Sequence, residues 1–131
     1  MNLNDYVKIF KALGEPTRLK ILKLLSVRPM FVCELESVLQ MSQPRISQHL
    51  RTMKEAGLVT EKKDAQRTFY SLQMEYLDES FNNLITFFHT DLADLPQFKE
   101  EHLRLQQLDS DADISLCKEG KTQALNLQRE A

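Results

Sequence analysis

The sequence has few of the residues that a disulfide-stabilised or membrane-embedded protein requires. Only two of its 131 residues are cysteines, and they lie far apart, so we expect free thiols rather than a disulfide scaffold. No apolar run approaches the roughly 18 residues that a membrane span needs. The first residues, MNLNDYVKIF, lack the basic and apolar regions of a signal peptide. The sequence therefore predicts a cytoplasmic protein with no membrane partner.

The chain also lacks the net positive charge of a typical nucleic-acid-binding protein, because its formal net charge is −2. The charge is unevenly distributed along the chain. Residues 42–73 hold six Lys or Arg against three Asp or Glu, a sum of +3, whereas residues 74–131 hold five against twelve, a sum of −7. Phosphate attraction depends on the local field, so the total does not exclude DNA binding. Taken alone, a net charge of +3 over residues 42–73 indicates an ordinary solvated surface.

Length and composition, with 42% apolar and 27% charged residues, predict one globular domain. Apolar residues at helical spacing predict helices over residues 3–12, 17–26, 31–40, 42–57, 75–90 and 98–108. Leu19, Leu22 and Leu25 fall on one face of their helix, which we expect to be the most deeply buried. From residue 109 the sequence is polar with little periodicity. We therefore expect a domain over residues 1–108 and a flexible or loosely docked tail over residues 109–131.

Residues 42–57, SQPRISQHLRTMKEAG, combine a helix start, two opposite faces and a stop. Ser42 is a favourable N-cap whose hydroxyl can accept from a first-turn amide, Pro44 is tolerated in that turn, and Gly57 suits the left-handed C′ position. Apolar residues at i, i+4 and i+7 form a narrow stripe, namely Ile46, Leu50 and Met53. The opposite face carries groups that hydrogen-bond base edges and phosphates, namely Gln43, Arg45, Ser47, Gln48, His49, Arg51 and Lys54. We interpret this helix as one that lies in a DNA major groove.

After this helix the period changes from 3.6 to about 2. Residues 58–63, LVTEKK, and residues 67–72, RTFYSL, predict a β-hairpin around residues 64–66. With the tight turn between the third and fourth helices, the hairpin predicts a winged helix-turn-helix, a mainly α fold with about five helices. Three cations cluster near the hairpin tip, namely Lys62, Lys63 and Arg67. They either meet DNA phosphates or protect an exposed edge strand from aggregation.

The helix over residues 75–90 carries more apolar surface than one small domain can cover. Leu77, Phe81, Leu84 and Phe88 form one stripe along it. A self-complementary stripe of this kind is typical of a twofold dimer interface. A homodimer also suits DNA reading, since a twofold protein matches a palindromic operator.

Four segments, in order and spacing, resemble the ArsR/SmtB family of bacterial winged-helix repressors. They are ALGEPTRLKIL, VCEL, SQPRISQHL, and AGLV with FYSL. The resemblance covers roughly residues 8–72, continues more weakly to about residue 105, and is closest to the arsenic-responsive branch. It implies a homodimer held by the first and last helices, which represses a nearby operon and releases double-stranded DNA when an inducer binds. The expected DNA-binding residues are Ser42, Gln43, Pro44, Arg45, Ser47, Gln48, His49, Arg51, Lys54, Lys62, Lys63 and Arg67.

The cysteines are candidate inducer ligands. Where arsenic-sensing relatives carry Cys-Val-Cys, this chain has Phe31-Val32-Cys33. Trivalent arsenic prefers three thiolates, so the resemblance implies arsenite or another soft metal at an incomplete site that includes Cys33. Redox or reactive-sulfur sensing through Cys33 and Cys117 is an alternative. A further alternative is that Cys33 is only a small buried apolar residue.

A second constellation resembles the sites of zinc-sensing relatives. His89, Asp91 and His102 reproduce the spacing of those ligands with the first two types exchanged, but Leu105 occupies the fourth position and cannot ligate. Three ligands can still hold a metal ion with water. The alternative is that these are ordinary surface residues. A repressor without a small inducer also stays open, and no cofactor is firmly predicted.

The sequence gives less support to two other classes of function, an enzyme and an interaction module. Cys33 with His49 is the only conceivable nucleophile pair, and no orienting acid accompanies it, so the sequence does not predict an enzyme. An interaction module that has lost DNA reading need not keep so many base-reading groups on one helix face. We therefore expect a DNA-binding repressor.

Overall fold

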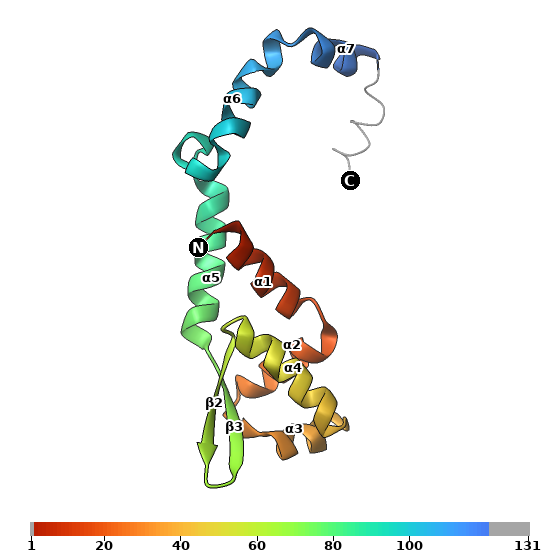
Figure 1. Cartoon of the computed structure of the whole chain (residues 1–131), viewed down its shortest axis with the longest axis vertical. Helices are drawn as coiled ribbons and strands as arrows, with labels where there is room; N and C mark the ends of the chain where they lie inside the picture. Colours follow the sequence, from red (N-terminus) through yellow and green to blue (C-terminus); the bar gives the residue numbers. More distant parts are fainter. Residues whose placement is uncertain (1, 121–131) are drawn as a thin grey trace. The chain divides into compact units, whose positions relative to one another are not determined.

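The computed structural model describes residues 2–120 and confirms a mainly helical winged helix-turn-helix fold with a small antiparallel sheet (Figure 1). These residues contain seven α-helices, whereas periodicity predicted six helical segments and the fold was expected to have about five helices. The elements are α1 (Leu3–Leu13), α2 (Pro16–Leu25), β1 (Met30–Phe31), α3 (Val32–Leu39), α4 (Gln43–Glu55), β2 (Val59–Asp64), β3 (Arg67–Leu72), α5 (Met74–His89), α6 (Lys99–Gln107) and α7 (Ala112–Gly120). Short 3-10 turns cover Leu92–Asp94, Pro96–Phe98 and Leu108–Ser110.

The first two helices begin at side-chain caps. Asn2 and Asp5 form a reciprocal capping box at α1, in which each side chain accepts from the other residue's amide at 3.0 Å. At α2 the Glu15 carboxylate accepts from the amide of Arg18 at 2.9 Å, and Pro16 occupies the first helical position. These caps satisfy amides that have no partner within the helix, and they define the turn between α1 and α2.

The sheet has the strand order β1–β3–β2. Strands β2 and β3 form the predicted hairpin, closed by a turn in which Ala65 has a positive φ of 56°. Strand β1 pairs with the other side of β3 through Met30 and Phe31, opposite Tyr70 and Phe69. The prediction that Phe31 begins a helix was therefore wrong. A two-residue strand is too short to show a period in the sequence.

One compact unit ends at Phe88, and its apolar core lies between the helices and the base of the hairpin. The most deeply buried side chains come from four elements and the loop before β2, namely Ile21, Leu35, Ile46, Leu50, Met53, Leu58 and Val59. The expected burial of Leu19 was wrong, since 51% of this side chain is exposed. The inward face of α2 is centred on Ile21, Leu22 and Leu25 instead, because Leu19 lies on the far side of the helix from Ile21.

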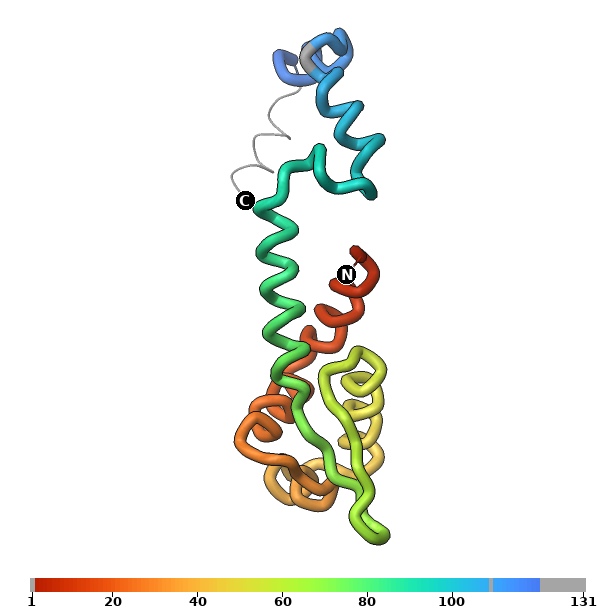
Figure 2. Tube along the Cα trace, turned by 90° about the vertical axis from the view of Figure 1, so that its left-hand side faces the viewer, coloured from red at the N-terminus to blue at the C-terminus, as the bar shows by residue number. Residues whose placement is uncertain are grey.

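Helix α5 runs alongside α1 in this unit (Figure 2). The ring centroids of Tyr6 and Phe87 are 5.8 Å apart, and those of Phe10 and Phe81 are 6.4 Å apart. Aromatic pairs at these separations are favourable when the rings are tilted or edge-on, as they are here. The hairpin projects from the helical body at the end of the unit away from α1 (Figures 1 and 2).

A second compact unit begins at His89 and contains α6 and α7. The predicted boundary at residue 108 stays a prediction. Helix α7 occupies part of the segment in which the sequence shows little periodicity, while residues 121–131 of the expected tail lie outside the described residues. None of the helices within residues 2–120 has the length and apolarity needed to cross a membrane.

Candidate nucleic-acid interface

Helix α4 is anchored to the protein along one narrow stripe. Ile46, Leu50 and Met53 are each 0% exposed, as the i, i+4, i+7 pattern predicted. Fully burying a side chain of this size contributes roughly 1.5–3 kcal/mol. The stripe therefore holds α4 in the core while the opposite side of the helix faces outward.

The C-terminal end of α4 is a Schellman motif. The amide of Gly57 donates to the Lys54 carbonyl at 3.0 Å, and the amide of Leu58 donates to the Met53 carbonyl at 2.9 Å. Gly57 has a φ of 81°, and a Cβ at this position would lie 3.0 Å from the Tyr76 ring. Glycine is therefore required both by the backbone conformation and by the close approach of α5.

The N-terminal end of α4 differs from the prediction in one detail. Ser42 occupies the N-cap position, but its side chain makes no capping hydrogen bond. Gln43 donates through Nε2 to the Ser47 hydroxyl at 2.6 Å, so these two side chains support each other on the surface. Ser42, Gln43 and Pro44 are exposed at this end of the helix, where an approaching phosphate would meet free amides and a favourable dipole.

The outward face of α4 presents polar and cationic side chains. Arg45, Gln48 and Arg51 are exposed and lie on the side away from the buried stripe. Within residues 2–120, the guanidinium groups of Arg45 and Arg51 make no hydrogen bond or ion pair with the protein. Arg and Gln are the side chains that pair most often with guanine and adenine edges, so this face has the chemistry of a base-reading surface.

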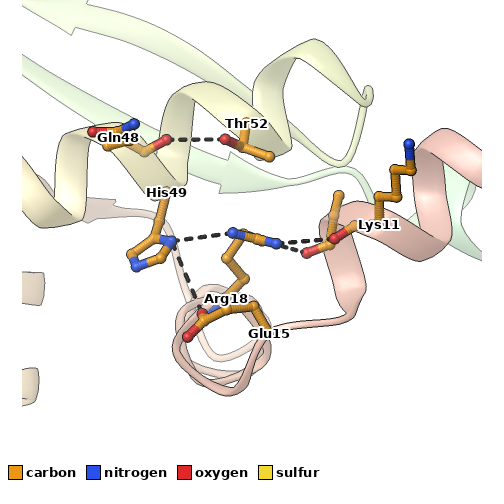
Figure 3. Close-up of polar contacts among 7 residues, drawn as sticks. Lys11, Glu15, Arg18, Gln48, His49 and Thr52 are labelled. Atoms are coloured by element: carbon orange, nitrogen blue, oxygen red, sulfur yellow. Dashed lines mark hydrogen bonds and ion pairs between the residues drawn. The ribbon is translucent and has the colours of Figure 1, made fainter.

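His49 does not belong to this outward face. Its side chain is 17% exposed, and its Nδ1 atom lies 3.4 Å from the Arg18 guanidinium and 3.9 Å from the Glu15 carboxylate (Figure 3). Both partners come from α2 and its N-cap. The structure thus gives His49 contacts inside the protein, and we remove it from the set of expected base contacts.

Lys54 also has a partner within the protein. Its ammonium group lies 2.5 Å from the Glu61 carboxylate on β2, and the Tyr70 hydroxyl donates to the same carboxylate at 2.8 Å. Hydrogen bonds from Lys54 and Tyr70 lower the pKa of Glu61 below its ordinary value. Burial, followed by the bond to Glu61, raises the pKa of Tyr70 to about 12. Both groups therefore keep their bonded protonation states near neutral pH, and they tie the end of α4 to the hairpin.

The hairpin carries the other expected cations. Lys62 and Lys63 are exposed on β2 near the tip. Arg67 lies on β3 with its guanidinium carbon 4.1 Å from the centre of the Phe31 ring, and Phe31 in turn packs edge-on against Phe69 at 5.7 Å. This cation–π contact orients Arg67 along the surface beside α3.

The candidate inducer ligands belong to several elements. Cys33 is an exposed free thiol in the first turn of α3, whereas Cys117 is a half-buried free thiol in the second unit. His89 is the last residue of α5, Asp91 follows it, and His102 lies in α6. Within residues 2–120 no three His, Cys, Asp or Glu side chains come close enough to hold a metal ion. The alternative in which Cys33 is only a small buried apolar residue is contradicted, because Cys33 is exposed.

An exposed apolar surface covers one side of the α1–α5 pair. Phe81, Ile85 and Phe88 are 40%, 56% and 74% exposed on α5. The neighbouring exposed residues on α1 are Leu3, Val7 and Phe10. Phe10 of α1 packs edge-on against Phe81 of α5, so the two sets meet there, and exposed apolar residues gathered in this way are typical of a protein–protein interface.

Three residues that contribute to this region, Arg18, Glu61 and Tyr70, were not predicted from the sequence. Arg18 joins α1, α2 and α4, and Glu61 with Tyr70 joins α4 to the hairpin. Each contact connects segments that periodicity treats separately. The one signal in the sequence was chemical, since an arginine and a histidine require polar partners when they are partly buried.

Comparison with known proteins finds a matching family and several similar regulators. A family described as "Bacterial regulatory protein, arsR family" matches residues 15–61. The arsenical resistance operon repressor of Staphylococcus xylosus is 37% identical over 84 residues, which cover 64% of this chain and 81% of that protein. The transcriptional repressor SdpR of Bacillus subtilis is 34% identical over 87 residues, covering 66% of this chain and 97% of that protein. The solved structure of HlyU from Vibrio cholerae has a TM-score of 0.55 and 34% identity, covering 69% of this chain and 100% of that chain.

Proposed function

Because the chain belongs to the arsR family of bacterial regulatory proteins, we propose that it represses transcription by placing helix α4 in the major groove of operator DNA. The observation that carries this proposal is the two-sided character of α4. One side is fully buried, while the other presents Arg45, Gln48 and Arg51 to solvent. A rigidly held helix with an outward polar face is what direct readout requires. The family is one of transcriptional regulators rather than enzymes.

The proposed contacts divide into two kinds. Gln43 and Gln48 reach adenine edges, with Ser47 supporting Gln43 through the observed hydrogen bond. Arg45 and Arg51 contact guanine edges or phosphates, and the exposed lysines of the hairpin contact phosphates beyond the groove. Phosphate contacts position the protein, whereas base contacts give it sequence preference.

The proposed repressor is a homodimer. The exposed apolar side of α1 and α5 supports this, since a second copy of the same surface would cover it across a twofold axis. Two α4 helices related by such an axis fit two half-sites of a palindrome. The dimer is thus part of the reading mechanism.

Salt dependence and two substitutions test DNA reading. Affinity for the chain's own promoter should fall steeply with added salt, because each phosphate contact releases counterions. Arg51→Ala should weaken binding to all sequences alike, by roughly tenfold, if Arg51 contacts phosphate, whereas Gln43→Ala should flatten the preference among sequences. Fluorescence anisotropy with promoter and shuffled duplexes measures both effects. Lys20→Ala, which removes an exposed cation from α2, is the control for charge alone. Wild-type affinity that is insensitive to salt would exclude phosphate contact.

We further propose that DNA release is controlled through Cys33. Its exposed thiol lies beside β1, which pairs with the hairpin strand β3, and beside Arg67 in a shallow hollow. A group bound to this thiol would therefore act next to both the hairpin and the helix preceding α4. The described residues do not form a three-thiolate site, so a soft metal held by this chain alone lacks the ligand set it prefers.

A gel-shift assay distinguishes the inducers. Arsenite, cadmium, zinc and an oxidant are added separately to the complex of promoter DNA with wild type or with Cys33→Ser. Release by arsenite, cadmium or oxidant that is lost in Cys33→Ser is the expected result. Cys117→Ser, tested in parallel, separates a single-thiol response from one that uses both cysteines. Release by zinc that persists in Cys33→Ser would instead favour His89, Asp91 and His102 and would contradict the role of Cys33.

A further inference from the structure

Arg18 joins three helices at one point (Figure 3). Its Nε atom donates to the Ala12 carbonyl at 2.7 Å, and one terminal nitrogen donates to the Lys11 carbonyl at 2.9 Å. Both acceptors belong to the last turn of α1. The other terminal nitrogen lies 3.4 Å from Nδ1 of His49 on α4. Arg18 itself lies in the first turn of α2.

The contacts with α1 determine where the remaining nitrogen points. Carbonyls in the last turn of a helix lack partners within that helix, so they are strong acceptors for a cation. The guanidinium group is planar, and its donors form a rigid fork. Once two donors of Arg18 are held by the Lys11 and Ala12 carbonyls, the third direction is fixed toward His49.

Glu15 completes the surroundings of the imidazole. Its Oε2 atom accepts from the Arg18 amide at 2.9 Å and lies 3.9 Å from Nδ1 of His49. Burial raises the pKa of Glu15, but hydrogen bonds from the Arg18 and Thr17 amides, together with His49, hold it below its ordinary value. A guanidinium at 3.4 Å and a carboxylate at 3.9 Å thus lie close to the same imidazole nitrogen, Nδ1 of His49.

The cluster of Glu15, Arg18 and His49 gives α4 a directional polar contact, which its buried apolar stripe does not provide. Apolar packing holds a helix against the core, but the hydrophobic effect favours no particular direction for any single contact. A hydrogen bond weakens steeply when its geometry is distorted. Among the described residues, His49 provides the one polar side-chain contact from α4 to the α1–α2 pair. The contact of His49 with Arg18 is therefore the directional restraint on the side of α4 that faces α1 and α2.

We infer that Arg18 and His49 are positioning residues that fix the rotation of α4 against the end of α1, and that the sequence preference of DNA binding depends on them. The inference rests on the proposed reading of DNA by α4. Rotating α4 by a few degrees moves Gln43 and Gln48 away from base edges, where hydrogen bonds need tight geometry. Contacts with phosphates tolerate such a change, because charge attraction is weakly directional.

Two variants of His49 test the directional contact. His49→Asn places an acceptor oxygen near the position of Nδ1, whereas His49→Leu keeps the bulk and removes the acceptor. The probes are a duplex selected from a random pool by the wild-type protein and the same duplex with its base sequence shuffled. His49→Leu should lower the ratio of the two affinities by roughly tenfold, the loss expected for one base contact. Affinity for the shuffled duplex should stay within about twofold, and His49→Asn should retain the wild-type ratio.

Arg18→Gln tests the other partner. It removes the guanidinium fork, and Lys20→Gln removes the same charge from an exposed site on the same helix. Arg18→Gln should lower the affinity ratio as His49→Leu does, while Lys20→Gln should not. The double variant Arg18→Gln/His49→Leu should lose no more than either single variant, because the two residues act through one contact. Circular dichroism and thermal melting establish that each variant is folded, and the His49 pair decides the matter if Arg18→Gln is not.

The outcomes separate this inference from the proposed function. If the wild type prefers no sequence in the selection, the reading of DNA by α4 is overturned. If the wild type shows a preference and the folded His49→Leu variant keeps it, DNA reading stands and the positioning role is overturned. An equal loss in His49→Leu and His49→Asn would also overturn it, because the acceptor would then be irrelevant.

Discussion

Substitution Ile85→Glu should leave the fold intact and convert the protein in solution from a dimer to a monomer. Ile85 is 56% exposed on α5, so a glutamate there remains hydrated in a single chain. In the proposed dimer the same position lies within the apolar surface formed with Phe81 and Phe88 and repeats across the twofold axis. Two carboxylates would then be buried without partners, a cost of several kcal/mol. Analytical ultracentrifugation at micromolar protein measures the change.

Losing the dimer should also weaken the affinity for operator DNA strongly. Two linked reading helices bind a palindrome more tightly than one by a factor of about 10² to 10⁴, because the second contact is intramolecular. Ile85→Glu should therefore weaken operator binding at least a hundredfold. Asn82→Glu, which adds the same charge at an exposed polar position of α5, should do neither. Persistence of a dimer in Ile85→Glu would show that another surface joins the two copies.

Leu50→Ala should lower the free energy of unfolding by about 3 kcal/mol. Leu50 is 0% exposed, and it lies between Ile46 and Met53 in the stripe that holds α4 to the core. The substitution removes buried methyl groups and leaves a cavity that the neighbouring helices fill only in part. Since a typical domain is stable by 5–15 kcal/mol, this loss is a substantial fraction of the total.

Urea unfolding followed by circular dichroism measures the effect, with all variants at one protein concentration because dimer dissociation contributes to apparent stability. Gln48→Ala is the matched control on the exposed side of α4 and should change stability by no more than about 0.5 kcal/mol. A loss below 1 kcal/mol for Leu50→Ala would mean that α4 is not anchored by this stripe.

Features set by neighbouring residues were predictable from the sequence. The buried stripe of α4 follows from a repeat of apolar residues, and its end follows from the one glycine placed after that repeat. The hairpin follows in the same way from alternation on either side of residues 64–66. In each case the local pattern and the tertiary contacts favour the same structure.

Features that depend on distant partners were not predictable. Leu19 has the spacing of a core residue, but two faces of α2 carry leucines, and packing against α1, α4 and β3 selects one of them. His49 and Lys54 look like DNA contacts because both are polar residues on α4. Their partners, Glu15 with Arg18 and Glu61, lie in other elements. Periodicity indicates which side of a helix is buried, but it does not identify the partners of polar residues at the border of that side.

The order of the strands has a consequence for how the protein folds. The hairpin β2–β3 closes over two residues, whereas 39 residues separate Met30 of β1 from its partner Tyr70 of β3. Closing a long loop costs more chain entropy than closing a short one. We therefore expect the pairing of β1 with β3 to form after the hairpin. During synthesis, the sheet stays incomplete until the ribosome has released residue 70.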